Sequence, residues 1–546
     1  MSCASMRLIS LTASLAGLAL LAPAAHASVG CTELAPGLLA SPGVKSANSQ
    51  IIAASGPNVA HCRVDILYGE NPEQNINIRV GLPLNELDGG TGGVQGAWNG
   101  RTQGIGGGGC SGSLNVGGPV NAGYVGSGND TGHSGGNCEP GVNEDGTYNY
   151  QFINDFIRNG MKQQILFSKA VAKTYYAMQP AYNYWNGCST GGRQGYVLAQ
   201  ELGNELDGIL ANAPAMYWTR FQTAQMWGQI VMKDLVGAPI SAAKLNQATA
   251  SAVAACDAAD GVADGVIDDP RTCKFSARAN VCGEPTAPAT SCLTLQEADA
   301  IDKIWDGPRN AQGDKIWFGL DRGTSLPALN GTFPFFLGVT QFHWDEHDRN
   351  FDWRTVSIDE YALVAQDGSR NIADVTDTFG NLDTFKAHGG KLLTFVGAND
   401  QLIMPRGVIN YYRQMAARYS NHDKPDFKGL QSFYRLFRVP GAGHCAVPQG
   451  LPALVDWVER GVAPEQIINR SATRSRPLCP YPQTAIYSGS GSTDDAANFY
   501  CGDNLEKLQT VCEDALAKYK DEASGPTDYT GMGVNPVACK NTARAP

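Results

Sequence analysis

The sequence predicts an α/β fold with a mostly parallel central sheet and a large inserted domain, and two observations carry this prediction. First, several apolar runs with strand character each end in a turn that contains Gly or Asn, which is the rhythm of alternating strands and helices. Second, this rhythm breaks between residues 217 and 378, where an Asp/Gly-rich loop and many aromatic residues occur. We therefore expect a core domain made of residues 28–216 and 379–501, with residues 217–378 inserted as a lid domain.

The chain begins with a stretch, residues 1–27, that has the features of a secretory leader. One early Arg precedes an apolar run of Leu and Ala, and a small-residue ending stands at Ala25-His26-Ala27, the pattern of a cleaved signal peptide. A membrane anchor is the alternative, but the apolar run is short for a span. Removal of the leader takes Cys3 and leaves an even number of the 15 cysteines, which suits disulfides in an oxidising compartment. We expect a secreted or periplasmic protein.

Four pairs of cysteines lie close in the sequence, although spacing alone proves no connectivity. They are Cys256/Cys273, Cys282/Cys292, Cys479/Cys501 and Cys512/Cys539. The last pair lies within residues 502–546, a helix-like tail that we expect to be a C-terminal extension of the core.

The charge balance excludes two classes of partner. The formal net charge is −11, and no cluster of Lys and Arg stands out. Nucleic acids and anionic membranes both require basic patches that neutralise phosphate. We therefore expect neither as a partner, and the oligomeric state stays open.

Four apolar runs are the predicted strands that surround the site. They are YNYWNG (182–187), LDGILANAPA (206–215), KLLTFVGAND (391–400) and SFYRLFRVPGAGHC (432–445). Open α/β sheets bind ligands at the carboxyl ends of their parallel strands. The turns after these runs are therefore the first place to look for chemistry.

Two stretches match the Gly-x-Ser-x-Gly pattern, GHSGG around Ser134 and GCSTG around Ser189. A nucleophilic serine in this pattern needs a strand before it and a helix after it, because the tight turn must hold Oγ above the sheet with the helix N-terminus directed at it. Loop residues flank Ser134 on both sides, whereas an aromatic strand precedes Ser189 and a helix-forming run follows it. We predict Ser189 as the nucleophile.

A serine hydroxyl is a poor nucleophile at neutral pH, so it needs a base and a group that orients the base. Of the five histidines downstream of Ser189, only His444 sits in a small-residue turn just after a convincing strand. Asp400 lies in the turn after the preceding strand, which gives the chain order serine, acid, histidine. Each residue alone could be an ordinary loop residue, but their joint placement favours a catalytic set.

Cysteines flank two members of this set, since Cys188 precedes the serine and Cys445 follows the histidine. A disulfide between them would tie the serine turn to the histidine loop and fix the separation on which proton transfer depends. Two buried free thiols are the alternative.

The combination of Cys188-Ser189, Asp400 and His444-Cys445 resembles the tannase and feruloyl esterase family of α/β-hydrolases. Further stretches that look like that family are CDAADGVADGVIDDPRTC, WVERGVAPEQI and RPLCPYPQTAIYSGSG. The resemblance implies a secreted serine carboxylesterase with an α/β-hydrolase core, a lid over the site and bulky aromatic-acid esters as small-molecule substrates. Feruloyl-type esters are the first expectation and galloyl esters, as for a tannase, the second.

Hydrolases of mono-hydroxyethyl terephthalate are similar to this chain in the serine turn, in the Asp/Gly-rich loop at residues 256–273 and in the RPLCPYPQ stretch. The lid here shows no match to their arginine- and serine-containing segment, and Ile403 stands where they place a Phe. Aromatic lid residues are expected to stack on an aromatic acyl group. They include Trp305, Trp317, Phe335, Phe336, Trp344 and Trp353.

The lid stretch at residues 256–273 carries Asp257, Asp260 and Asp264 in a Gly-punctuated loop. Closely spaced carboxylates with turn glycines suit a hard cation, and Ca²⁺ is the natural candidate outside the cell. The resemblance implies a similar structural calcium site, in which the backbone carbonyls of Val262 and Val266 complete the shell.

The stretch GIGGGGCSG (104–112) could be a flexible linker. It also resembles the oxyanion loop of the family, which implies that the N–H groups of Gly107 and Thr190 stabilise the oxyanion of the tetrahedral intermediate.

Two alternative hypotheses, a zinc site and a catalytically idle binding protein, compete with the serine esterase. HWDEH (His343 to His347) matches a zinc pattern that requires a helix, and the residues around it are poor helix formers, so we expect a polar lid turn. A catalytically idle protein that binds an aromatic ligand would show the same leader and aromatic residues, but the complete serine, acid and histidine set argues against it.

Overall fold

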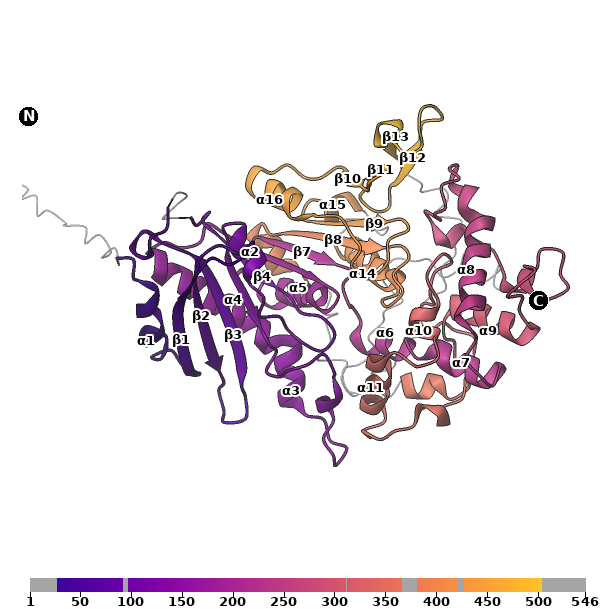
Figure 1. Ribbon diagram of the computed structural model, residues 1–546, viewed down its shortest axis with the longest axis horizontal. Helices are drawn as coiled ribbons and strands as arrows, with labels where there is room; N and C mark the ends of the chain where they lie inside the picture. The colour runs from indigo at the N-terminus through magenta and orange to yellow at the C-terminus, as the bar shows by residue number, and fades with distance from the viewer. Residues whose placement is uncertain (1–26, 92–96, 311, 366–380, 420–426, 503–546) are drawn as a thin grey trace, which may run out of the picture.

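A nine-stranded sheet forms the centre of the computed structural model, which describes residues 27–91, 97–310, 312–365, 381–419 and 427–502 (Figure 1). In spatial order its strands are β1 (Val44–Ile52), β2 (His61–Tyr68), β3 (Ile76–Pro83), β5 (Val125–Asn129), β4 (Arg101–Ile105), β6 (Tyr182–Cys188), β7 (Gly208–Asn212), β8 (Lys391–Gly397) and β9 (Tyr434–Val439). The strands from β5 to β9 in this order pair in parallel, whereas β1, β2, β3 and β5 pair antiparallel. The predicted α/β fold is confirmed.

The strand sequences reflect what covers each part of the sheet. Strand β2 alternates half-buried with buried residues, the pattern of a strand with only one face on the core. In β6, by contrast, the neighbouring side chains of Tyr184 and Trp185 are both 0% exposed, although successive strand residues point to opposite faces. The parallel part of the sheet is therefore covered on both faces, as crossover helices require.

The helices that cover the two faces of the sheet belong to two different apolar clusters of the core. On one face, Tyr196 of α5 (Thr190–Glu201) and Tyr411 of α14 (Pro405–Arg418) meet edge to face, with ring centroids 5.3 Å apart. On the other, Trp457 of α16 (Leu451–Arg460) packs in one apolar cluster with Tyr184. The helices outside the insertion are α1 (Leu34–Leu38), α2 (Gly117–Asn121), α3 (Tyr150–Asn154), α4 (Gly160–Tyr176), α5 (Thr190–Glu201), α13 (Asp383–His388), α14 (Pro405–Arg418), α15 (Phe427–Gln431) and α16 (Leu451–Arg460).

The chain leaves the sheet after β7 and returns at β8, which pairs directly with β7 through Gly208 and Lys391. Between these strands lie α6 (Trp218–Ala224), α7 (Trp227–Leu235), α8 (Ala242–Cys256), α9 (Leu295–Asp306), α10 (Pro327–Asn330) and α11 (Phe336–Asp345). In Figure 1 these helices gather beside the sheet, at the end away from β1. The described part of the insertion is thus a helical body attached between two neighbouring strands.

After β9 the chain forms two small antiparallel ribbons. They pair β10 (Ile467–Arg470) with β11 (Ser475–Leu478), and β12 (Thr484–Tyr487) with β13 (Phe499–Gly502). The predicted leader, apart from Ala27, and the C-terminal extension beyond Gly502 lie outside the described residues.

Six disulfides join cysteines of the described residues. They are Cys31–Cys62, Cys110–Cys138, Cys188–Cys445, Cys256–Cys273, Cys282–Cys292 and Cys479–Cys501. Three of the four cysteine pairs that lie close in the sequence are among them, and the fourth, Cys512/Cys539, lies outside the described residues.

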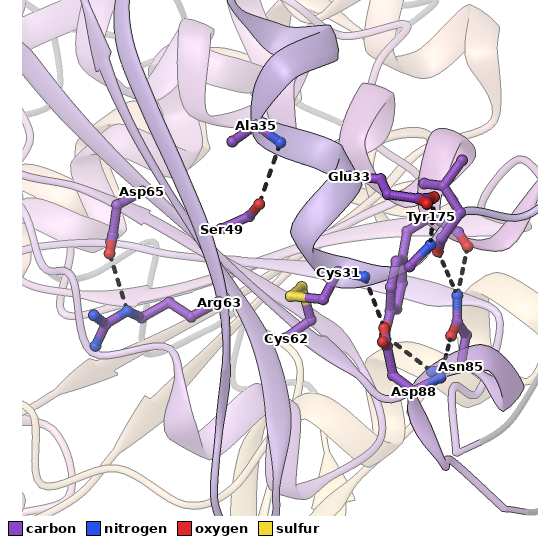
Figure 2. The surroundings of a disulfide bond; sticks show 12 residues. Cys31, Glu33, Ala35, Ser49, Cys62, Arg63, Asp65, Asn85, Asp88 and Tyr175 are labelled. Carbon is purple, nitrogen blue, oxygen red and sulfur yellow. Dashed lines mark hydrogen bonds and ion pairs between the residues drawn. A yellow bond between two sulfur atoms is a disulfide. The ribbon is translucent and has the colours of Figure 1, made fainter.

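The disulfide between Cys31 and Cys62 fastens the N-terminal segment to β2, at the antiparallel end of the sheet (Figure 2). Asp88 reinforces this attachment, because its carboxylate accepts the Cys31 N–H at 2.8 Å and the hydroxyl of Tyr175 at 2.6 Å. The side chain of Tyr175 comes from α4, so the disulfide, the strand and the helix form one fixed corner.

Candidate active site

Ser189 lies in a tight turn between β6, which ends at Cys188, and α5, which begins at Thr190. Its backbone has φ +61° and ψ −125°, a strained conformation for a residue with a side chain. The glycines on either side permit it: a Cβ on Gly187 would lie 2.5 Å from the carbonyl carbon of Gly191. The Gly-Cys-Ser-Thr-Gly sequence is therefore what this close turn requires.

His444 and Asp400 form a hydrogen-bonded pair in the loops after β9 and β8. The distance from His444 Nδ1 to Asp400 Oδ2 is 2.8 Å, and Asp400 is only 2% exposed. The other carboxylate oxygen, Oδ1, accepts the N–H groups of Leu402 and Ile403, each at 2.9 Å. An ionised carboxylate held in this way accepts the Nδ1–H of the imidazole, which leaves Nε2 as the proton acceptor.

A glutamine that the sequence analysis did not single out connects the two loops. The side-chain Oε1 of Gln401 accepts the backbone N–H of His444 at 3.0 Å. In the sequence this residue is distinguished only by its position next to Asp400, and that position does not indicate that its side chain contacts His444.

The disulfide between Cys188 and Cys445 brings the serine turn and the histidine loop together. Its two Cα atoms are 5.9 Å apart, across 257 residues of sequence. Because each cysteine is the direct neighbour of a predicted catalytic residue, the bond brings the backbones of Ser189 and His444 into adjacent positions. All three members of the predicted set thus lie at the carboxyl ends of β6, β8 and β9.

The glycine loop after β4 contacts the start of α5. Thr190 Oγ1 donates to the carbonyl oxygen of Gly109 at 2.5 Å, and the Gly191 N–H donates to the carbonyl oxygen of Gly107 at 2.9 Å. The N–H of Gly107 itself donates to Gln194 Oε1 at 3.1 Å. The structure thus places this loop beside the residue that follows Ser189, and the role of Gly107 as an oxyanion donor stays a prediction.

The predicted calcium loop is folded by hydrogen bonds to its own aspartates. Asp257 accepts the N–H groups of Asp264, Gly265 and Val266 at 2.9 to 3.2 Å. In the same loop Asp260 Oδ1 accepts the N–H of Val262 at 2.9 Å. The described residues contain no group of three or more His, Cys, Asp or Glu side chains arranged to hold a metal ion.

The carboxylates of the predicted calcium loop nevertheless lie close enough to repel one another. Burial raises the pKa of Asp268 to about 7, and the negative charge of Asp260 adds to the rise. Burial likewise raises the pKa of Asp260. Asp264 forms ion pairs with two arginines, because its Oδ2 contacts Arg474 at 3.0 Å and Arg476 at 2.5 Å. Crowded carboxylates of this kind fit the ligand chemistry of a hard cation, which would relieve their mutual repulsion.

Asp269, next to that loop, is bound on two sides by arginines. Its carboxylate contacts Arg271 Nη2 at 2.7 Å and Arg438 Nη1 at 3.0 Å. Burial acts to raise its pKa, but the positive charges of Arg438 and Arg271 outweigh burial and hold the pKa well below the ordinary value. Since Arg438 belongs to β9, this ion pair fastens the insertion to the sheet.

The HWDEH stretch differs from the expected polar turn. Residues Phe336–Asp345 form α11, so His343 is helical, and the expectation of poor helix formation is wrong there. Packing explains the difference, because burial of Phe342 and Trp344 at 0% and 1% exposure outweighs weak helix propensity. The helix ends before His347, which contacts Gly146 while His343 contacts Glu139; the two imidazoles do not share a ligand position.

Most of the aromatic lid residues build the core of the insertion. Trp305, Trp317 and Trp344 are each 1% exposed and Trp353 is 9% exposed. Only Phe336 of the expected set is substantially exposed, at 50%. The four tryptophans therefore pack in the interior, and stacking of lid residues on an acyl group stays a prediction.

The fold and the site together define a class of protein. The serine lies in a strained turn between a strand and a helix. An aspartate and a histidine follow it along the chain, each after a later parallel strand. This is the arrangement of the α/β-hydrolases. No helix of the described residues is long and apolar enough to cross a membrane.

Comparisons with known proteins specify the family. The family model for tannase and feruloyl esterase matches residues 94–502. A probable feruloyl esterase from Arthroderma benhamiae is 34% identical over 451 residues, which cover 74% of this chain and 80% of that protein. Mono(2-hydroxyethyl) terephthalate hydrolase from Piscinibacter sakaiensis is 28% identical over 492 residues, with 74% and 79% covered.

Solved structures show the same fold. Feruloyl esterase B from Aspergillus oryzae has a TM-score of 0.74 and 22% identity, covering 87% of this chain and 100% of that chain. Tannin acyl hydrolase from Aspergillus niger has a TM-score of 0.73 and 23% identity, covering 86% and 92%. The chain belongs to the tannase and feruloyl esterase family, and it is a carboxylic ester hydrolase.

Proposed function

We propose that this protein hydrolyses esters of phenolic aromatic acids, with feruloyl-type esters preferred, through an acyl-enzyme formed on Ser189. The observation that carries the mechanism is the His444–Asp400 pair, which the Cys188–Cys445 bond holds beside the strained serine turn. The substrate class rests on the family and on relatives named feruloyl esterase.

The reaction follows from the geometry of this pair. Ser189 Oγ attacks the ester carbonyl carbon while its proton passes to His444 Nε2, and Asp400 stabilises the resulting imidazolium. The protonated imidazole then gives its proton to the departing alcohol. Water repeats the sequence on the acyl-enzyme, releases the aromatic acid and restores the serine.

The negative oxygen of each tetrahedral intermediate needs N–H donors at about 2.7 to 3.1 Å. The Thr190 N–H at the start of α5 is one proposed donor, and the helix dipole supports it. The glycine loop supplies the second, with Gly107 as the predicted residue. Its N–H must then exchange Gln194 Oε1 for the substrate oxygen.

Galloyl and terephthalate esters are the alternative substrates within the family. One relative is named for mono(2-hydroxyethyl) terephthalate, but in this chain Ile403 is only 5% exposed and its N–H is bound to Asp400. A buried aliphatic side chain there offers no aromatic ring to the substrate. This argues against terephthalate esters as the preferred substrates.

The experiment that tests the proposal compares hydrolysis of methyl ferulate, methyl gallate and mono-hydroxyethyl terephthalate by the wild type and by Ser189→Ala. We expect methyl ferulate to be hydrolysed fastest, and the activity to vanish in the variant. A fluorophosphonate probe should label the wild type alone. A wild type that is neither active nor labelled would instead be an idle ligand-binding protein.

Two further parts of the proposal concern the protein's stability and location. We propose that Ca²⁺ has a structural role in the lid, held by the carboxylates of Asp257, Asp260 and Asp264 with the carbonyls of Val262 and Val266. Chelation by EDTA should then lower Tm, and added Ca²⁺ should restore it; an unchanged Tm would contradict the site.

Export with cleavage after residue 27 should appear as a mature N-terminus at Ser28 in mass spectrometry.

A further inference from the structure

We propose that residues 136–141, here called the clasp, position the oxyanion-binding glycine loop by fixing it to lid helix α11. This inference rests on the proposed function, because it concerns the same tetrahedral oxyanion. The residues of the clasp act through the glycine loop, so their role is positioning.

At one end the clasp is joined to the glycine loop by two adjacent links. The N–H of Cys110 donates to the carbonyl oxygen of Gly136 at 3.0 Å, and Cys110 forms a disulfide with Cys138. Both cysteines are buried. Since Gly109, the residue before Cys110, accepts the hydroxyl of Thr190, the connection continues to the residue that follows the nucleophile.

At the other end the clasp is held by one face of α11. Thr340 Oγ1 donates to Asn137 Oδ1 at 3.0 Å, His343 Nδ1 lies 2.9 Å from Glu139 Oε1, and Trp344 Nε1 donates to the carbonyl oxygen of Cys138 at 3.0 Å. Residues three and four apart lie on the same face of a helix, so these three side chains form a single row directed at the clasp.

Trp344 packs tightly against the clasp. A Cβ added to Gly141 would lie 1.9 Å from Trp344 Cζ2, which means that the indole ring packs directly on the glycine backbone. The carbonyl oxygen of Trp344 also accepts the hydroxyl of Tyr148 at 3.0 Å. Close-packed contacts of this kind transmit displacements instead of absorbing them.

The glycine loop needs such an external support. Residues 106–109 are four consecutive glycines, which carry no side chains that could pack and which favour many backbone conformations. Oxyanion donors, however, must stand within a few tenths of an ångström of their working positions. The disulfide and the row of α11 side chains add a constraint to the hydrogen bonds that Gly107 makes with α5, so the lid helps to set the geometry of the oxyanion site.

The test replaces the covalent link, in the variant Cys110→Ser/Cys138→Ser, and compares it with Cys282→Ser/Cys292→Ser, which removes another disulfide of the chain. For the first variant we expect kcat to fall by about tenfold or more, with KM changed by less than about twofold, because a displaced donor weakens the transition state more than the bound ester. The second variant should keep the wild-type kcat.

Two inhibitors separate positioning from a general loss of structure. A boronic acid that forms a tetrahedral adduct with Ser189 should bind about tenfold more weakly to Cys110→Ser/Cys138→Ser, whereas the planar product, ferulic acid, should bind as it does to the wild type. Trp344→Phe removes both the donor to the Cys138 carbonyl and the indole edge that packs on Gly141, so it should show the same selective change at about threefold. This variant serves if the double variant fails to fold.

Two outcomes would overturn the inference. One is an unchanged kcat and boronate affinity in both clasp variants, and the other is an equal weakening of boronate and ferulic acid together with a lower Tm. Failure of the proposed function is distinguishable, because the wild type itself would then hydrolyse none of the three esters.

Discussion

Asp400→Asn tests the acid of the site most directly, because asparagine keeps the shape of the side chain and changes only its donors. In the wild type Asp400 Oδ2 accepts from His444 Nδ1 at 2.8 Å, and Oδ1 accepts two backbone N–H groups. The oxygen of asparagine can stay on those two N–H groups, which places its NH₂ group against Nδ1. The imidazole must then carry its proton on Nε2, where it cannot accept the proton of Ser189.

The magnitude follows from the loss of the correct tautomer. We expect kcat to fall by about 10⁴-fold, which corresponds to about 5.4 kcal/mol of transition-state stabilisation. The free energy of unfolding should change by less than about 1 kcal/mol, since both backbone donors keep their acceptor. In the matched control Asp400→Ala the N–H groups of Leu402 and Ile403 lose that acceptor, and each buried donor left unsatisfied costs about 1 to 3 kcal/mol.

The assay is steady-state hydrolysis of the preferred ester, together with thermal or urea unfolding of all three proteins. The reasoning would be refuted by a kcat of Asp400→Asn within about tenfold of the wild type. It would also be refuted if Asn and Ala at this position destabilised the protein equally, because the two backbone hydrogen bonds would then have no measurable effect.

Three other changes probe the supports of the site. Cys188→Ser/Cys445→Ser opens a 257-residue loop, so unfolding should become easier by up to about 5 kcal/mol and kcat should fall; an unchanged Tm would contradict this. Asp269→Asn should destabilise the protein by about 3 kcal/mol at pH 7. The charges of the arginine partners outweigh burial and hold the pKa of Asp269 low in the folded state. Its contribution is therefore fully present above about pH 5, begins to be lost as the pH falls through the unfolded value of about 3.9, and continues to be lost down to the lower folded pKa. Urea unfolding at pH 7 and pH 3 should show the wild type losing more stability than the variant, and parallel losses would exclude this role. Gln401→Met removes the acceptor of the His444 N–H and should lower kcat about tenfold with little change in KM, whereas Gln401→Glu, which keeps an acceptor, should retain most of the activity.

The order of elements around Ser189 could be predicted because local constraints determine it. The residues that flank the serine distinguish Ser189 from Ser134, so the strand before Ser189 and the helix after it follow from the local sequence. The same holds for Asp400 and His444, which follow apolar runs whose length and composition identify strands. Helix α11 could not be predicted, since its formation depends on burial of Phe342 and Trp344 against distant segments.

The sequence by itself determined the fold class, the family and the residue types of the site, because each is encoded by local patterns: strand and turn periodicity, a glycine-bounded serine and cysteines beside two of the predicted catalytic residues. Only the tertiary structure decided which side chains support that site. These side chains are Gln401 beside His444, Arg438 beside Asp269, and the α11 residues that contact the clasp. Each contacts a residue that is far away in the sequence, and no periodic pattern in the sequence indicates such a contact. Their positions are set by packing between segments that are distant in the sequence, and packing is a property of the whole chain.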